Sequence, residues 1–300
     1  MITSTPSPGA GAPPPSTTRL APVEAPRLLP FARFGVLFGW GLRRLFKTKK
    51  FVWTAGLAVA VGVLAGLAMS GVKDPAYALW EFLGTSALGV CVPLIALALA
   101  AGGFGEEVSE QTLVFHLVRP VSRTTLFLAR FVAGLGPAIA ASCALCLVAT
   151  ILSGVGVPIA SVGLSLATAA IGTVVVGAVY YALAALFRRG LVAGLVYTFV
   201  IEGFFQFIPG SVQKLALGHY VRSLFHRLCD ADFAALSQRV ARDADRGNLS
   251  VLKPRRLQDV IAPEPWSSIP NALLVCAIVA CLALILGAWT VRRRDFALKD

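Results

Sequence analysis

Residues 131–187 read FVAGLGPAIAASCALCLVATILSGVGVPIASVGLSLATAAIGTVVVGAVYYALAALF and contain no charged side chain. A bilayer core is crossed by about 20 apolar residues of helix, so this run is long enough for two crossings. The segment SGVGVP at 153–158 supplies a tight turn between them. The run therefore predicts a pair of transmembrane helices over about 126–152 and 159–187.

Four more apolar runs flank this pair and extend the same pattern along the chain. The protein is 57% hydrophobic and only 14% charged, with a mean hydropathy of +0.76, which is too few charges to cover a soluble protein of 300 residues. The runs are continuous rather than alternating, which favours helices over a barrel. We expect an all-α integral membrane protein with six transmembrane helices, over about 51–72, 82–103, 126–152, 159–187, 191–208 and 268–291.

The N-terminal fifty residues divide into two parts. Residues 1–26 are rich in Pro, Ser, Thr, Gly and Ala, which predicts a disordered cytoplasmic tail. Residues 27–50 alternate Leu, Phe and Trp with Arg and Lys at helical spacing, which is typical of an amphipathic helix along the membrane surface. An early start of the first span is the alternative. Residues 27–300 would form one six-span transmembrane domain.

The basic residues predict the orientation. Cations gather at 43–50, at Arg119, Arg123 and Arg130, at 188–189 and at 292–294, and these positions alternate with loops that carry one Lys. The positive-inside rule places them, and both termini, on the cytoplasmic side of the inner membrane. The net charge of +12 invites a nucleic-acid partner, but cations that flank apolar runs fit anionic lipid better, so we expect none.

Residues 209–267 form a long polar segment between the last two spans. This arrangement makes it extracytoplasmic, although it is basic, because long loops follow the positive-inside rule weakly. Its part from Val212 to Val240 has the mixed apolar and charged character of one or two surface helices.

The charge-rich loop 105–123 lies between the second and third spans. Ser109 and Glu110 have the composition of a helix start, and Leu113, Phe115 and Leu117 give that helix a short apolar face. Arg119-Pro120 ends it, and Ser122 is placed to cap the next helix. A solvated loop has no need of exposed apolar side chains, so we expect this short helix to dock on a cytoplasmic partner.

The stretch EEVSEQTL…RPVSR at 106–123 resembles the loop between the second and third spans of ATP-binding-cassette (ABC) permeases of type 2. Members of that family commonly show an acidic run, Gly-Thr-Leu, a few apolar residues and Pro-Val-Ser-Arg. Gln111 stands where the family usually has Gly, and Val108 and Ser109 interrupt the acidic run. The resemblance extends to the six-span layout, the amphipathic first helix, the polar segment after the fifth span and the basic C-terminal tail.

This resemblance implies a type-2 ABC exporter permease architecture: a transmembrane subunit, itself no enzyme, paired with a second copy or a paralogue. It implies that loop 105–123 acts as a coupling helix on a separate cytoplasmic ATPase, which would bind ATP and Mg. The chain has no G-x-x-x-x-G-K-[ST] phosphate loop of its own. The implied ATPase contacts are Glu107, Glu110, Thr112, Leu113, Phe115, Leu117, Arg119, Pro120 and Arg123. The substrate is left open; a secondary transporter or a non-transporting scaffold is the rival interpretation.

Glu202 is the acid within the fifth apolar run, and Gln206 follows one turn later. Ionisable residues in spans usually face a bundle interior or a pathway. A structural role, for example binding backbone groups of an adjoining segment, and a substrate contact are both open. Cys143-x-x-Cys146 and the separated His116, His219 and His226 are interpreted as packing or surface residues, so we expect neither a metal nor a cofactor on this chain.

Overall fold

The apolar runs fold as long helices in the computed structural model, which describes residues 49–72, 74–101, 122–187, 189–205, 211–246 and 267–293, with Gly35 and Gly39. All regular structure in these ranges is helical. The first elements are α2 (Lys49–Ser70), α3 (Pro75–Glu81), η1 (Phe82–Cys91), α4 (Val92–Ala96), η2 (Leu97–Ala101), α7 (Arg123–Leu152) and α8 (Ile159–Leu186). They are followed by α9 (Gly190–Tyr197), η3 (Thr198–Phe204), η4 (Ser211–Leu215), α11 (Leu217–Arg246) and α13 (Ile269–Arg293). The predicted tail 1–26 and nearly all of the predicted amphipathic helix lie outside these ranges.

Five helices are long and apolar enough to cross a membrane: Phe51–Ser70, Pro75–Leu99, Arg123–Leu152, Ile159–Leu186 and Ile269–Arg293. The prediction of a helical, multi-pass membrane protein is confirmed. The remaining predicted span, 191–208, corresponds to the apolar helix Gly190–Phe204, which is shorter than 18 residues. At 1.5 Å per residue it provides about 22 Å of helix, short of a core about 30 Å thick.

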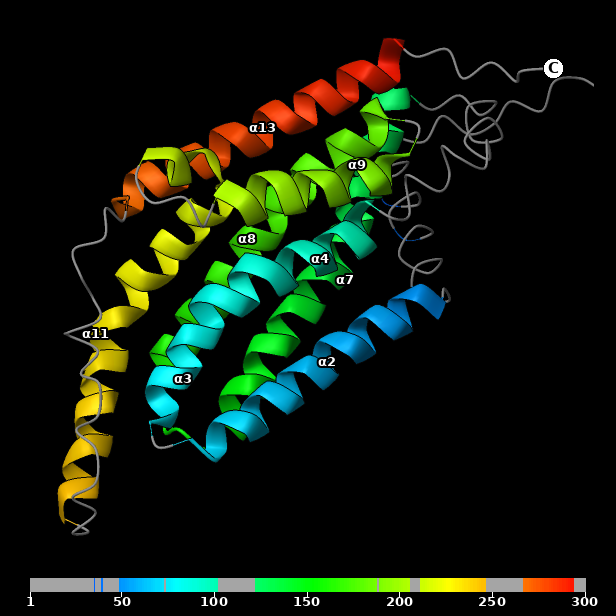
Figure 1. Cartoon of the computed structure of the whole chain (residues 1–300). Helices are drawn as coiled ribbons and strands as arrows, with labels where there is room; N and C mark the ends of the chain where they lie inside the picture. Colours follow the sequence, from blue (N-terminus) through cyan, green and yellow to red (C-terminus); the bar gives the residue numbers. More distant parts are fainter. Residues whose placement is uncertain are drawn as a thin grey trace, which may run out of the picture.

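Several helix ends that carry basic residues gather at one end of the bundle (Figure 1). The starts of α2, α7 and α9 gather at one end of the bundle with the ends of η2, α8 and α13. Lys49, Arg123, Arg189, Arg292 and Arg293 lie at this end, which we call the basic end. Helix α2 passes into α3 at the opposite end, where Asp74 caps the start of α3, and Glu81 is the last residue of α3.

The second span departs from a regular α-helix. Its π-helical segments η1 and η2, whose hydrogen bonds run from residue i to i+5, lie on either side of α4. Pro93 stands at the start of α4, where its missing N–H interrupts the ladder of backbone bonds. The second span therefore changes its helical winding on either side of the segment that contains Pro93.

Helix α2 packs chiefly against α7 through small residues. A Cβ atom added to Gly62 would lie 2.8 Å from the Leu145 carbonyl oxygen, and one added to Gly66 would lie 2.6 Å from Leu152 Cβ. The glycines therefore let two backbones approach more closely than larger residues allow, as small-xxx-small pairs do in membranes.

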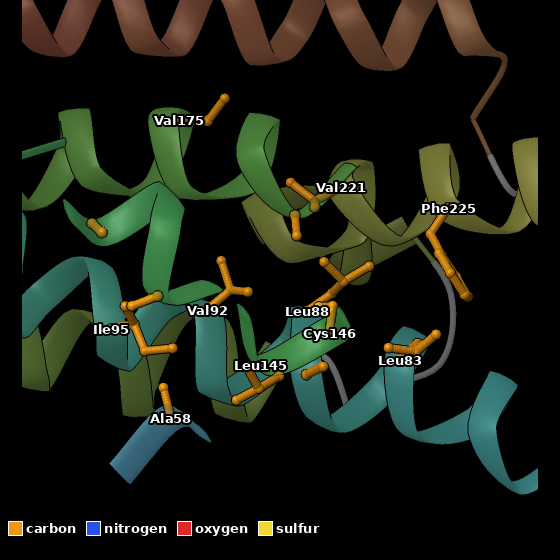
Figure 2. Close-up of a cluster of buried hydrophobic side chains, with 14 of the residues drawn as sticks. Ala58, Leu83, Leu88, Val92, Ile95, Leu145, Cys146, Val175, Val221 and Phe225 are labelled. Carbon is orange, nitrogen blue, oxygen red and sulfur yellow. The ribbon is translucent and has the colours of Figure 1, made fainter. Parts of the chain in front are cut away.

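The main core lies between the second span, α7, α8 and α11 (Figure 2). Leu83, Val92, Leu145, Val175 and Phe225, from these four parts of the chain, belong to one buried cluster. Many large apolar side chains elsewhere are exposed, above all on α2, α9 and α13. A soluble protein rarely shows so much apolar surface, whereas lipid covers it readily.

Helix α11 corrects the expectation of surface helices at Val212–Val240. It is one helix whose first half is buried against α8, α13, η1 and α3. Figure 1 shows it starting beside the middle of its neighbours and running past the end of the bundle. Composition alone misses this because the helix buries polar side chains, among them His219, Ser223 and His226, along with its apolar ones.

Candidate functional site

The predicted ATPase-coupling residues lie, except for Arg123, outside the described part of the chain: Glu107, Glu110, Thr112, Leu113, Phe115, Leu117, Arg119 and Pro120. What the structure describes is the pair of helices that flank them. Helix η2 ends at Ala101, α7 begins at Arg123, and the two pack against each other. The predicted cap is confirmed, because Ser122 Oγ accepts the Thr125 N–H at 3.2 Å. The loop is thus joined at both ends to one packed pair of helices.

Glu202 occupies a buried site on η3, with 1% of its surface exposed. Its Oε1 accepts the backbone N–H of Leu217 at 3.0 Å, and its Oε2 accepts the N–H of Gly218 at 2.8 Å. The hydroxyl of Tyr197 donates to Oε1 at 3.1 Å. Gln206, predicted as its neighbour, lies outside the described residues.

The hydrogen bonds of Glu202 satisfy backbone N–H donors at the start of α11. The first N–H groups of a helix have no partner within that helix, and the start carries a partial positive charge. In the bilayer each unpaired backbone group costs several kcal/mol, since no water is present to bind it. A carboxylate that accepts two of these N–H groups allows a helix to begin inside the bundle.

Hydroxyl groups extend this site toward α8. Tyr180 OH and Thr198 Oγ1 are 2.6 Å apart, and Thr198 Oγ1 donates to the Gly194 carbonyl at 2.8 Å. The rings of Tyr180 and Tyr197 meet edge to face with centroids 5.9 Å apart. We call Tyr180, Tyr197, Thr198 and Glu202 the junction cluster, because it joins α8, α9, η3 and the start of α11.

Farther along α11, two aspartates accept hydrogen bonds from side chains of α3 and α8. Trp80 Nε1 donates to Asp230 Oδ1 at 2.8 Å, and His226 Nδ1 lies 3.2 Å from the same oxygen. Ser161 Oγ donates to Asp232. The helix is therefore held at its start by η3 and along its length by α3 and α8.

Cys229 provides a test of this packing, because it lies on α11 with 0% of its surface exposed. Burial raises the pKa of its thiol to about 12, so it remains protonated and unreactive at neutral pH. We expect a charged, membrane-impermeant maleimide to leave Cys229 unlabelled in the native protein and to label it after denaturation in detergent.

A matched control for that labelling is Ala231→Cys, in a Cys229→Ser background, because Ala231 is exposed on the same helix. The thiol introduced at position 231 should be labelled in the native protein. If native Cys229 reacted at a similar rate, α11 would not pack as described. Mass spectrometry of the labelled peptides measures both rates.

The hydrogen bonds of these sites hold helices together. Within the described ranges, no three His, Cys, Asp or Glu side chains are grouped as a metal site requires. Sequence reasoning singled out Glu202 as the acid in an apolar run, but missed Tyr180, Tyr197, Thr198 and Asp230. Tyr180 and Asp230 bond to Thr198 and Trp80 on other helices, so no spacing in the sequence links those pairs. Tyr197 lies five residues before Glu202, close enough in sequence for the pair to be found.

Comparison with known proteins finds similarity to one family. The model of a family described as a protein of unknown function (DUF2705) matches residues 58–206, from within α2 to just past η3. A search of curated proteins finds no match. The chain is thus similar over nearly half its length to a family without an assigned function, and this similarity stops before α11 and α13.

Proposed function

We propose that the chain is the transmembrane permease subunit of an ATP-driven ABC transporter of type 2, coupled through loop 105–123 to a separate ATPase. The observation that carries the proposal is the stretch EEVSEQTL…RPVSR at 106–123, between the second and third spans. The close packing of η2 on α7 supports it, because a force on the loop would reach both helices. The cations at the basic end favour a cytoplasmic location for that end.

The proposal includes six crossings. Five are the long apolar helices. The sixth is made jointly by α9–η3, which starts at the basic end, and by the first turns of α11, with the Glu202 bonds at the join. Both termini would lie in the cytoplasm, on the inner membrane, and residues 209–267 would lead to the outer side.

In this proposal the ATPase subunits bind ATP and Mg and close, and the coupling loop moves with them. Packed helices with discrete arrangements carry such a motion across a bilayer. Two permease subunits, identical or paralogous, would enclose the pathway, and transport would run outward. The chain itself catalyses no reaction.

A secondary transporter is the rival class. It needs an ionisable group in the membrane that can exchange protons or ions. Both carboxylate oxygens of Glu202, the buried acid of the fifth apolar run, accept backbone N–H groups. Because both oxygens are held in these bonds, Glu202 is better suited to a structural role than to the exchange of protons or ions.

The test is capture of partners by the tagged protein in mild detergent, beside a variant with Glu110→Arg and Leu113→Asp. We expect a P-loop ATPase to be retained by the wild type and lost by the variant, because the changes reverse a charge and interrupt the apolar face of the loop. A matched control carries the same kinds of change away from the basic end, Glu81→Arg and Leu215→Asp, where both side chains are exposed. Absence of any ATPase from the folded wild type would contradict the proposal.

A further inference from the structure

The last membrane helix, α13, exposes a continuous apolar stripe that ends in a cation. Five large side chains of the stripe are exposed: Leu274, Ile278, Leu282, Ile285 and Trp289. They follow one another at intervals of three or four residues, which places them on one face of the helix. Arg293 is the next member of this series, four residues after Trp289.

The Arg293 guanidinium is held at the end of the stripe. Its Cζ lies 4.3 Å from the centre of the Trp289 ring, a cation–π contact. From Leu274 to Arg293 the helix rises about 29 Å, close to the thickness of the hydrocarbon core. A lipid-covered stripe of this length places Trp289 and Arg293 at the level of the headgroups, where Trp rings collect.

Two more exposed cations lie at the same end, Arg292 and Arg189. Arg189 stands in the short turn between α8 and α9, beside the exposed apolar side chains of Phe187 and Leu191. Val291 fixes the end of α13 against α8, since it is buried in a cluster with Tyr181 and Ala184. Within the described part of the chain, none of these three arginines forms an ion pair with a carboxylate.

We infer that Arg189, Arg292, Arg293 and Trp289 form a binding site for the headgroup of an anionic phospholipid. Guanidinium groups pair with phosphate through parallel N–H bonds, and the indole ring and the apolar side chains below it accept the acyl chains. The lipid-facing stripe that leads into the site favours a lipid over a protein partner. The inference does not depend on the transport proposal, since it needs only the membrane and these residues.

The test is native mass spectrometry of the delipidated full-length protein, mixed with equal amounts of phosphatidylglycerol and phosphatidylcholine. We expect the wild type to retain phosphatidylglycerol preferentially. Each Arg→Gln change at 189, 292 or 293 should weaken that retention about fivefold, as expected for one cation near an anionic surface. Trp289→Leu should weaken it while leaving the charge unchanged, and Arg293→Lys should keep most of it.

The control is Lys214→Gln, which removes an exposed cation on η4, far from the basic end. Thermal unfolding in a neutral detergent shows whether each variant stays folded. Equal retention of the two lipids by the wild type would overturn the inference, and so would an equal loss in Lys214→Gln. If the arginine variants keep phosphatidylglycerol but lose a captured ATPase, the site serves a protein partner and the inference is wrong.

Discussion

Replacing Glu202 with Gln is expected to destabilise the folded protein by about 2–4 kcal/mol, although the change adds or removes hardly any volume. The carboxylate accepts the N–H groups of Leu217 and Gly218 on separate oxygens. An amide offers one oxygen and one NH₂, so a donor would face a donor at one of them. A buried donor without an acceptor costs about 1–3 kcal/mol, and a lost bond to a charged group about 1.5–3 kcal/mol.

The Glu202→Gln measurement is thermal unfolding of the purified protein in lipid nanodiscs. Its matched control is Glu81→Gln, the same chemical change at an exposed acid. The control is expected to unfold within experimental error of the wild type. Equal stability of Glu202→Gln and Glu81→Gln would show that the carboxylate does not hold the start of α11.

Enlarging the glycines of α2 is the second change with a large expected effect. The double change Gly62→Leu and Gly66→Leu should separate α2 from α7. Even a Cβ atom on residue 62 would lie 2.8 Å from the Leu145 carbonyl oxygen, and one on residue 66 would lie 2.6 Å from Leu152 Cβ. Overpacking typically costs about 1–3 kcal/mol at a single site, and here backbone atoms cannot move aside as a flexible side chain can.

The control for this pair is Gly56→Leu on the same helix, because a Cβ atom there would have no neighbour within 4 Å. The control should leave the unfolding temperature and the yield of folded protein nearly unchanged. The Gly62/Gly66 variant should have a lower unfolding temperature and a lower yield of folded protein. A tolerated Gly62/Gly66 variant would mean that α2 and α7 do not pack through these residues.

The fold class and most helix positions could be predicted from the sequence because the bilayer sets both the length and the polarity of a crossing. The limits of α8, predicted as 159–187 and observed as Ile159–Leu186, follow from the turn at 153–158 and the charges after Phe187. The cap at Ser122 could be predicted for a similar reason, since it depends on local chemistry. The packing of Gly62 and Gly66 against α7 could not be predicted, because their spacing does not indicate which helix they contact.

The polar segment after the fifth apolar run shows where such reasoning fails. Its composition predicts exposure, yet the first half of α11 is buried. The cause is a set of specific bonds, from Glu202 to the helix start and from Trp80 and Ser161 to Asp230 and Asp232. These bonds join residues up to 150 positions apart, so periodicity and composition do not reveal them.

The coupling of loop 105–123 to an ATPase is tested most directly by photo-crosslinking in living cells. A photoreactive phenylalanine analogue replaces Phe115 in the loop and, as a control, Leu215 on η4, where the side chain is exposed at a distance from the basic end. We predict a covalent adduct from position 115, and none from position 215, with a chain that contains a P-loop phosphate-binding sequence. If position 115 yields no such adduct in cells where the protein is folded and membrane-inserted, the transporter assignment is contradicted.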